Sequence, residues 1–151
     1  MRPMSKIVQA MACLLYPSII VFGAYLIVHG HLTPGGGFQG GAVAASAIAL
    51  MIVAYGSKKY NKTRLSALES TGLVMFISLG LLGLGVAFFH NFLANTGGIF
   101  GELVEYGTNL GNLNTAGTIP LMNIAVGLEV VGALGLMMVI LAKGPEKGGR
   151  V

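Results

Sequence analysis

The chain has 151 residues, of which 54 % are hydrophobic and 9 % charged, and its formal net charge is +4. Soluble domains carry about 25 % charged residues, so this composition excludes a water-soluble protein and predicts one integral membrane domain over residues 1–151. The basic residues lie between or beyond apolar segments, which favours a membrane topology over a nucleic-acid partner. The single cysteine, Cys13, excludes a disulfide or a Cys-based metal site, and we expect a buried, unreactive thiol.

Residues 7–29 form the first predicted helix, an uncharged segment long enough to cross roughly 30 Å of hydrocarbon. It is too long for a signal-peptide core of about 7–15 residues. Pro17 lies inside it and leaves the carbonyl of Cys13 without its helical partner. We expect a kink that serves packing, the alternative being a functional kink.

A loop without charged side chains follows at residues 30–41, with the sequence GHLTPGGGFQGG. Its Gly35, Gly37 and Gly40 match the pattern G-x-G-x-x-G. A dinucleotide site also needs a strand before the pattern, a helix after it and an acidic residue about 20 positions on. Apolar segments of membrane length flank this loop and the next acidic residue is Glu69, so the nucleotide interpretation is excluded.

Two histidines, His29 and His31, flank Gly30 where the first helix is predicted to stop. Gly30 and the following Pro34 are typical of a helix C-terminus. A histidine is stabilised there by the helix dipole and by interfacial water, which explains both residues structurally. The alternative is a proton relay, because histidine titrates near neutral pH.

Residues 38–55 form the second predicted helix. Small residues recur on one of its faces at every fourth position: Gly37, Gly41, Ala45 and Ala49. Such a face lets another helix approach closely. We therefore expect this helix to be surrounded by protein, with little lipid contact.

The third predicted helix covers residues 68–89. Ser66 and Glu69 form the pattern S-x-x-E before an apolar run, which predicts a capping box. Glu69 would then be an N-cap partner near the membrane interface, and a cation entry residue is the alternative. A further face suited to close packing consists of Phe76, Gly80, Gly83 and Ala87.

Residues 91–120 form a long connection rich in glycine and asparagine. A structureless loop of this length is unusual, so we expect it to lie against other subunits. Residues 99–106 could form a short amphipathic helix. Pro120 suits the first turn of the fourth predicted helix, residues 121–142.

Glu129 lies near the middle of that fourth helix, where an ionised carboxylate costs roughly 2.5–3.5 kcal/mol on insertion scales. Ala125, Gly132 and Ala133 lie beside it, so this face should pack against protein. One interpretation is an ion-translocating carboxylate. The other is a neutral carboxylic acid hydrogen-bonded to a neighbouring backbone.

Catalytic and metal-binding patterns are absent from the sequence. No nucleophile is paired with a base, and no spacing such as H-E-x-x-H occurs. We therefore expect a non-catalytic protein with no metal and no cofactor.

The basic residues also predict the topology. All nine lie in the N-terminal segment, the loop at residues 56–65 or the C-terminal tail, which four spans place on one side. The positive-inside rule puts that side, with both termini, in the cytoplasm. The predicted class is an all-α, multi-pass protein of the cell membrane with four transmembrane helices.

The string at residues 30–41, with the Ala-rich run that follows, resembles the signature of the MnhB (MrpB) subunit of multisubunit cation/proton antiporters. The same subunit type occurs in the antiporter-like modules of archaeal membrane-bound hydrogenase-type complexes. The resemblance implies a subunit that helps move Na⁺ and H⁺ beside other membrane subunits, without a redox centre. It implies a structural motif made of Pro34, Gly35, Gly36, Gly37, Gly40 and Gly41.

The segment from Asn123 to Gly132 resembles the last-helix motif of this family. The motif usually begins with Asp and is apolar at the position of Glu129. An Asp-based role therefore does not transfer to Asn123, and Glu129 is a candidate substitute. The candidates for ion translocation are Glu129, Glu69, His29, His31 and Asn123.

Two other functions remain open at this point. The first is a small proton-coupled exporter that acts as a dimer, although such proteins carry their essential glutamate in the first helix, which is uncharged here. The second is a scaffold that only fills space between active subunits.

Overall fold

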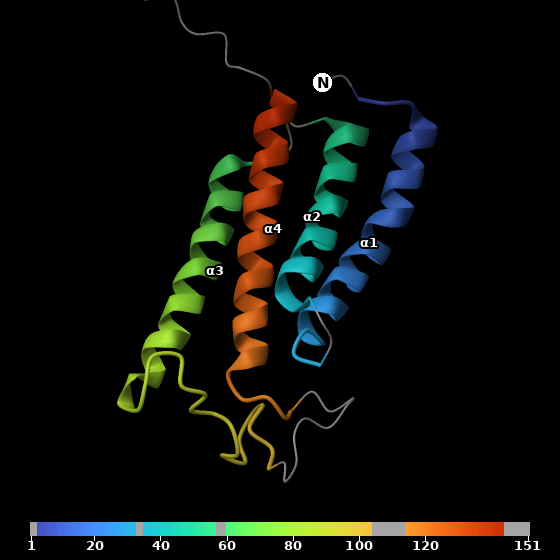
Figure 1. Cartoon of the computed structure of the whole chain (residues 1–151). Coiled ribbons are helices and arrows are strands. Elements are labelled where there is room, and N and C mark those ends of the chain that lie inside the picture. Colours follow the sequence, from blue (N-terminus) through green and yellow to red (C-terminus); the bar gives the residue numbers. More distant parts are fainter. Residues whose placement is uncertain (1–2, 33–34, 57–59, 104–113, 144–151) are drawn as a thin grey trace, which may run out of the picture.

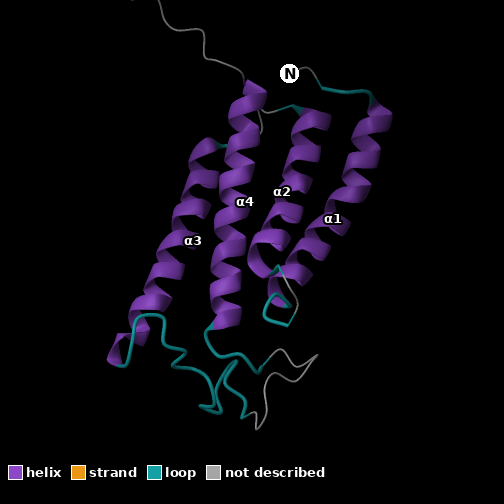
Figure 2. Cartoon of the chain, viewed as in Figure 1, coloured by secondary structure: helices purple, strands orange, loops and turns teal. Residues whose placement is uncertain are grey.

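The computed structural model describes residues 3–32, 35–56, 60–103 and 114–143. These ranges contain four long helices and no strand: α1 (Lys6–Val28), α2 (Gly36–Tyr55), α3 (Lys62–Leu82) and α4 (Ile119–Lys143) (Figures 1 and 2). All four are long and apolar enough to cross a membrane. The prediction of an all-α membrane protein with four spans is confirmed.

The helices lie side by side in the order α1, α2, α4, α3, so that α4 packs between α2 and α3 (Figure 1). The start of α1 and the end of α4 lie at the same end of the bundle. Within α1 only Ala12 and Gly23 are buried, because this helix packs mainly against α2. For the same reason Cys13 is exposed on the surface of this chain, and the prediction of a buried thiol is wrong.

Glycines bring the backbones of α1, α2 and α4 into direct contact. A Cβ added to Gly40 would lie 2.7 Å from the carbonyl oxygen of Gly23 on α1. One added to Gly41 would lie 2.9 Å from the carbonyl oxygen of Gly127 on α4. Any side chain at these positions would force the helices apart. Gly41 belongs to the predicted small-residue face of α2, and Gly37, Gly41 and Ala45 of that face are buried, which confirms that the face packs against protein.

The start of α3 differs from the prediction. The side chain of Asn61 caps the helix, because its Oδ1 accepts a hydrogen bond from the backbone N–H of Thr63 at 2.9 Å. Asparagine is among the strongest N-cap residues. Ser66 and Glu69 therefore lie inside α3, and the predicted capping box is wrong.

The end of α3 also differs from the prediction. A single 3₁₀ turn, η2 (Gly83–Gly85), follows Leu82, so the helix does not reach residue 89. Gly80 contacts the ring of Phe89, whose centroid lies 5.5 Å from that of Phe76. The predicted face around Gly80 thus packs against the returning chain, and Ala87 is not on the helix.

Asn91 ties the connection to the start of α4. Its Oδ1 accepts hydrogen bonds from the backbone N–H and the hydroxyl of Thr118, at 2.8 and 3.0 Å. Its Nδ2 donates to the carbonyl of Ala116 at 3.0 Å. Pro120 lies in the first turn of α4, as predicted.

After η2, the described part of the connection between α3 and α4 contains no further helix. Residues 99–103 are turn and irregular chain, so the helix predicted for residues 99–106 does not form there, and residues 104–106 lie outside the described residues. Backbone hydrogen bonds hold the segment, including one of 2.9 Å from Glu102 to the carbonyl of Asn114.

Candidate functional site

Glu129 lies near the middle of α4 and is half-buried. A Cβ added to Gly72 of α3 would lie 2.6 Å from the backbone nitrogen of Glu129 and 2.7 Å from the carbonyl oxygen of Ala125. The backbones of α3 and α4 therefore touch at this level. The prediction that this face of α4 packs against protein is confirmed.

Glu69 lies at nearly the same depth on α3, where it is also half-buried. A Cβ added to Gly132 of α4 would lie 2.5 Å from the backbone nitrogen of Glu69. Glu69 is seven residues past Lys62, the first residue of α3, and thus roughly 10 Å along the helix. The expected place at the helix N-terminus is wrong, because α3 begins earlier than predicted.

The backbones of Glu69 and Glu129 thus lie on one seam between α3 and α4. The backbone of Glu69 lies beside Gly132, and the backbone of Glu129 lies beside Gly72. Since Gly132 follows Glu129 by one turn, the two levels differ by about 4.5 Å along the axis. Among the described residues every lysine and arginine lies outside the middle of the helices: Lys6, Lys62, Arg64 and Lys143.

A carboxylate at this depth is stable when it is protonated, hydrogen-bonded, in contact with water or bound to a cation. A proton and a cation compete for the same negative charge. A carboxyl group there can therefore exchange one ion for the other: its O–H bond breaks as the proton leaves, and the cation then binds the carboxylate.

Asn123 lies on another face of α4, enclosed by the glycine loop. A Cβ on Gly30 would lie 3.0 Å from its Nδ2, and one on Gly36 would lie 2.9 Å from its Oδ1. Gly37 lies against its backbone carbonyl. The Nδ2 atom is buried and has no hydrogen-bond partner among the described residues. The glycines thus form a cradle that any side chain would fill.

The positions of the loop require glycine for two different physical reasons. Gly35 and Gly36 adopt φ values of 108° and 38°, a left-handed conformation that favours glycine. Gly37, Gly40 and Gly41 are buried in helix contacts. Of the predicted structural motif only Pro34 lies outside the described residues.

The two histidines lie at the end of α1, as predicted. His29 is the C-cap residue, its Nδ1 lies 3.3 Å from the carbonyl of Tyr25, and its ring lies 4.1 Å from the Tyr25 ring. Both ring nitrogens of His31 are shielded from solvent. The helix dipole stabilises a histidine at this position.

The candidates therefore form two groups that share α4. Glu69 and Glu129 lie on its contact with α3, whereas Asn123 lies on its contact with the glycine loop. No cluster of three or more His, Cys, Asp or Glu that could hold a metal ion occurs among the described residues.

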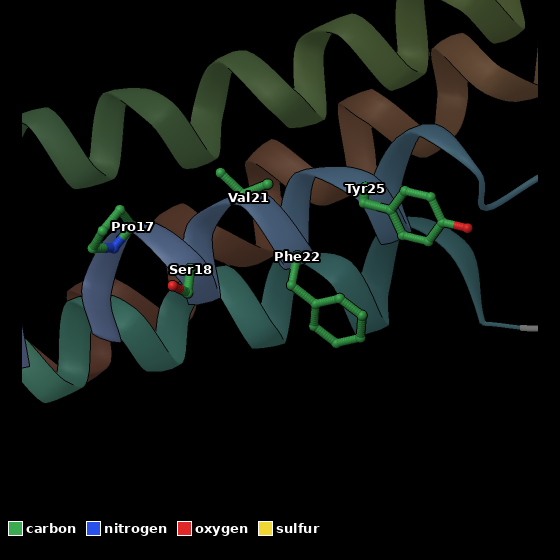
Figure 3. Close-up of a pocket in the computed structure, with 5 residues that line it drawn as sticks. All are labelled: Pro17, Ser18, Val21, Phe22 and Tyr25. Atoms are coloured by element: carbon green, nitrogen blue, oxygen red, sulfur yellow. The ribbon is translucent and has the colours of Figure 1, made fainter. Parts of the chain in front are cut away.

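A groove of about 570 Å³ on the surface of α1 offers little chemistry. Figure 3 shows that its lining side chains all come from that one helix: Pro17, Ser18, Val21, Phe22 and Tyr25. The lining is mainly apolar. This groove is therefore no candidate for ion exchange.

Sequence patterns missed the shared seam of Glu69 and Glu129. The available signals were Asn61, which competes with Ser66 as a cap, and the small residues Gly72 and Gly132. Each of these glycines lies three residues from one of the glutamates. Nothing in a linear pattern pairs two segments so distant in sequence.

Comparison with known proteins agrees with this geometry. Residues 7–143 match the family model described as a domain related to the MnhB subunit of Na⁺/H⁺ antiporter. A subunit of the Na⁺/H⁺ antiporter of Bacillus subtilis is 32 % identical over 133 residues, which cover 85 % of each chain. An uncharacterised protein of Methanocaldococcus jannaschii is 36 % identical over 130 residues, 82 % of this chain and 47 % of that protein.

A solved structure shares the fold. A chain of the membrane-bound sulfane sulfur reductase, an archaeal respiratory membrane complex, superposes with a TM-score of 0.73 at 33 % identity. The match covers 89 % of this chain and 57 % of that one. The chain thus spans about half the length of two of these relatives and most of the protein from Bacillus subtilis. With four spans and a family match over nearly its whole length, this multi-pass membrane protein belongs to the MnhB family.

Proposed function

We propose that this chain is a membrane subunit of a multisubunit Na⁺/H⁺ antiporter, either free-standing or as the antiporter-like module of a respiratory membrane complex. The observation that carries the proposal is the match to a Na⁺/H⁺ antiporter subunit over 85 % of both chains. The likeness to a chain of a respiratory membrane complex supports the second setting.

Within that complex, Glu69 and Glu129 exchange a proton for a sodium ion. Their backbone positions at the glycine contacts between α3 and α4 support this role. Asn123, His29 and His31 form a second polar group near one end of the membrane, through which ions reach or leave the seam. The buried amide of Asn123 supports that part of the path.

The subunit itself catalyses no chemical reaction and works beside other membrane subunits. The uncovered apolar surface of α1 supports such neighbours, since Ile7, Leu14 and Val21 are each at least 66 % exposed on the isolated chain. Both termini lie in the cytoplasm, because the basic residues gather at that end of the bundle.

Purification in a mild detergent tests the proposal. Native mass spectrometry of material isolated through a tag on this chain should reveal a large hetero-complex. A small homodimer would contradict the proposal and support a proton-coupled exporter. A hetero-complex whose transport is unchanged when both glutamates are substituted would support the scaffold function.

A further inference from the structure

A second cavity lies at the end of the bundle where α2 ends and α3 begins. Its volume is about 430 Å³, and three segments of the chain line it: Cys13 and Tyr16 of α1, Met51 and Tyr55 of α2, and Tyr60 before α3. Unlike the groove on α1, it gathers three phenol hydroxyls and a thiol around one space. None of these residues belongs to the ion-exchange proposal.

Tyr55 connects the two helices that form most of the wall. Its hydroxyl lies 2.9 Å from the Sγ of Cys13 and donates to the carbonyl of Gln9 at 3.4 Å. This hydroxyl is therefore already engaged within the protein. It holds the thiol at the wall of the cavity.

The ring of Tyr60 packs against the core, whereas its hydroxyl donates no hydrogen bond to another described residue. The ring packs against the core cluster of Ile48, Ile52, Leu65 and Val139. Burial, and next the neighbouring Tyr16, raise the pKa of Tyr60, so its hydroxyl stays protonated at physiological pH. Neither Tyr60 nor Tyr16 donates a hydrogen bond to another described residue, although half-buried tyrosine hydroxyls usually find an acceptor.

The surrounding charge selects the kind of acceptor. The lysines and arginines that the structure describes all flank helix ends on this side: Lys6, Lys62, Arg64 and Lys143. The acidic residues that it describes lie within the spans or on the opposite loop: Glu69, Glu129 and Glu102. Basic surfaces beside transmembrane helices attract anionic lipid headgroups.

The depth of the cavity fits a phospholipid. Tyr55 is the last residue of α2 and Tyr60 lies two residues before α3, so both lie at headgroup level. Tyr16 starts deeper on α1, but side chains of a helix point back toward its N-terminus, which is this end. Met51 lies one turn inside Tyr55, where the glycerol backbone and the first methylenes would be.

We propose that this cavity binds an anionic phospholipid, whose phosphate accepts hydrogen bonds from the hydroxyls of Tyr16 and Tyr60 and whose glycerol and upper acyl chain contact Met51. Cys13, on the cavity wall, then lies beside the bound lipid. The reactivity of Cys13 therefore reports whether the lipid is bound.

The experiment measures alkylation of Cys13 in the purified complex that contains this chain. A small membrane-permeable maleimide is added with increasing short-chain phosphatidylglycerol, and the peptide bearing Cys13 is quantified by mass spectrometry. The lipid should protect Cys13 saturably. Tyr16→Phe and Tyr60→Phe keep both rings but remove the hydroxyls, and each should raise the half-protecting concentration about tenfold. Tyr25→Phe, at the other end of α1, should leave it unchanged.

Several results would overturn the proposal. A Cys13 that no concentration of lipid protects would show that the cavity is not a lipid site. A Cys13 that never reacts, even after delipidation, would show that a partner subunit fills the space. Equal protection by inorganic phosphate would identify an anion site without a lipid, and equal protection by phosphatidylcholine would remove the charge selection. Unchanged protection in both Phe variants would exclude the hydroxyls as donors.

Discussion

At residue 129 a carboxylate side chain leaves α4 where the backbone of α3 touches it, at the contact with Gly72. The same holds for Glu69 at the contact with Gly132. Variants of these two glutamates therefore test whether this subunit exchanges ions or only supports neighbours that do.

Glu129→Gln tests this role, because glutamine keeps the shape and most of the hydrogen bonding but cannot ionise. We expect normal assembly and a loss of sodium-driven pH change to the level of vesicles without the complex. Glu69→Gln should have the same effect if both carboxylates share the exchange. The measurement is sodium-driven pH change in vesicles containing the whole complex, with complex content determined on the same sample.

Glu102→Gln is the matched control, since this carboxylate lies on the loop between α3 and α4. It should transport at the wild-type rate. Wild-type rates and an unshifted pH profile in both seam variants would remove the glutamates from the mechanism and favour a scaffold.

At the scale of the element, α3 and α4 depend on glycine for their contact. Gly72→Ala would place a methyl group 2.6 Å from the backbone nitrogen of Glu129. Backbone cannot yield as a flexible side chain can, and overpacking typically costs about 1–3 kcal/mol. We expect a lower thermal stability of the complex, measured by the temperature at which it aggregates in detergent.

Gly85→Ala provides the comparison for that variant. No atom lies within 4 Å of the position that its Cβ would take, and its φ is not in the left-handed range. It should leave the thermal stability unchanged. Equal stability of the two variants would mean that α3 and α4 are further apart than the structure indicates.

The start of α3 gives a second prediction at this scale. Asn61→Ala removes the acceptor for the backbone N–H of Thr63 and should lower stability by about 1 kcal/mol, a common cost of losing an N-cap. Ser66→Ala should have little effect, because Ser66 lies on the exposed face inside the helix. Thermal aggregation of the two variants compares the two caps directly. The reverse order would restore the capping box formed by Ser66 and Glu69.

At the scale of the whole molecule, α1 and α3 begin and α4 ends at one end of the bundle, and the long connection lies at the other end (Figure 1). The described lysines and arginines lie at the first of these ends. The asymmetry of charge predicts that the basic end faces the cytoplasm. Single cysteines in a Cys13→Ala background test this. Ser5→Cys, at the start of α1, should be shielded from an impermeant thiol reagent in intact cells, whereas Ile99→Cys, at a side chain 78 % exposed, should be labelled.

Opening the cells provides the control for that experiment. Ser5→Cys should become reactive once the reagent reaches both sides of the membrane. Labelling of Ser5→Cys but not of Ile99→Cys in intact cells would invert the topology and place both termini outside.

Much of the fold follows from local properties of the sequence. A membrane span needs only an apolar segment of sufficient length, because a helix satisfies its own backbone hydrogen bonds and transfer into lipid is a sum over residues. The four spans, the small-residue face of α2 and the place of Pro120 are of this kind. The glycine string at residues 30–41 carried the family resemblance, since several constrained positions lie together in one short segment.

Tertiary contacts decided what local patterns left ambiguous. Asn61 and Ser66 both suit an N-cap, and the earlier start includes Leu65, which is only 9 % exposed in the core formed with α2 and α4. That choice placed Glu69 two turns inside α3 and not at its N-terminus. The seam that carries Glu69 and Glu129, the cradle around Asn123 and the tyrosine cavity each join segments far apart in the chain. Such contacts depend on how whole helices pack, which no single segment encodes.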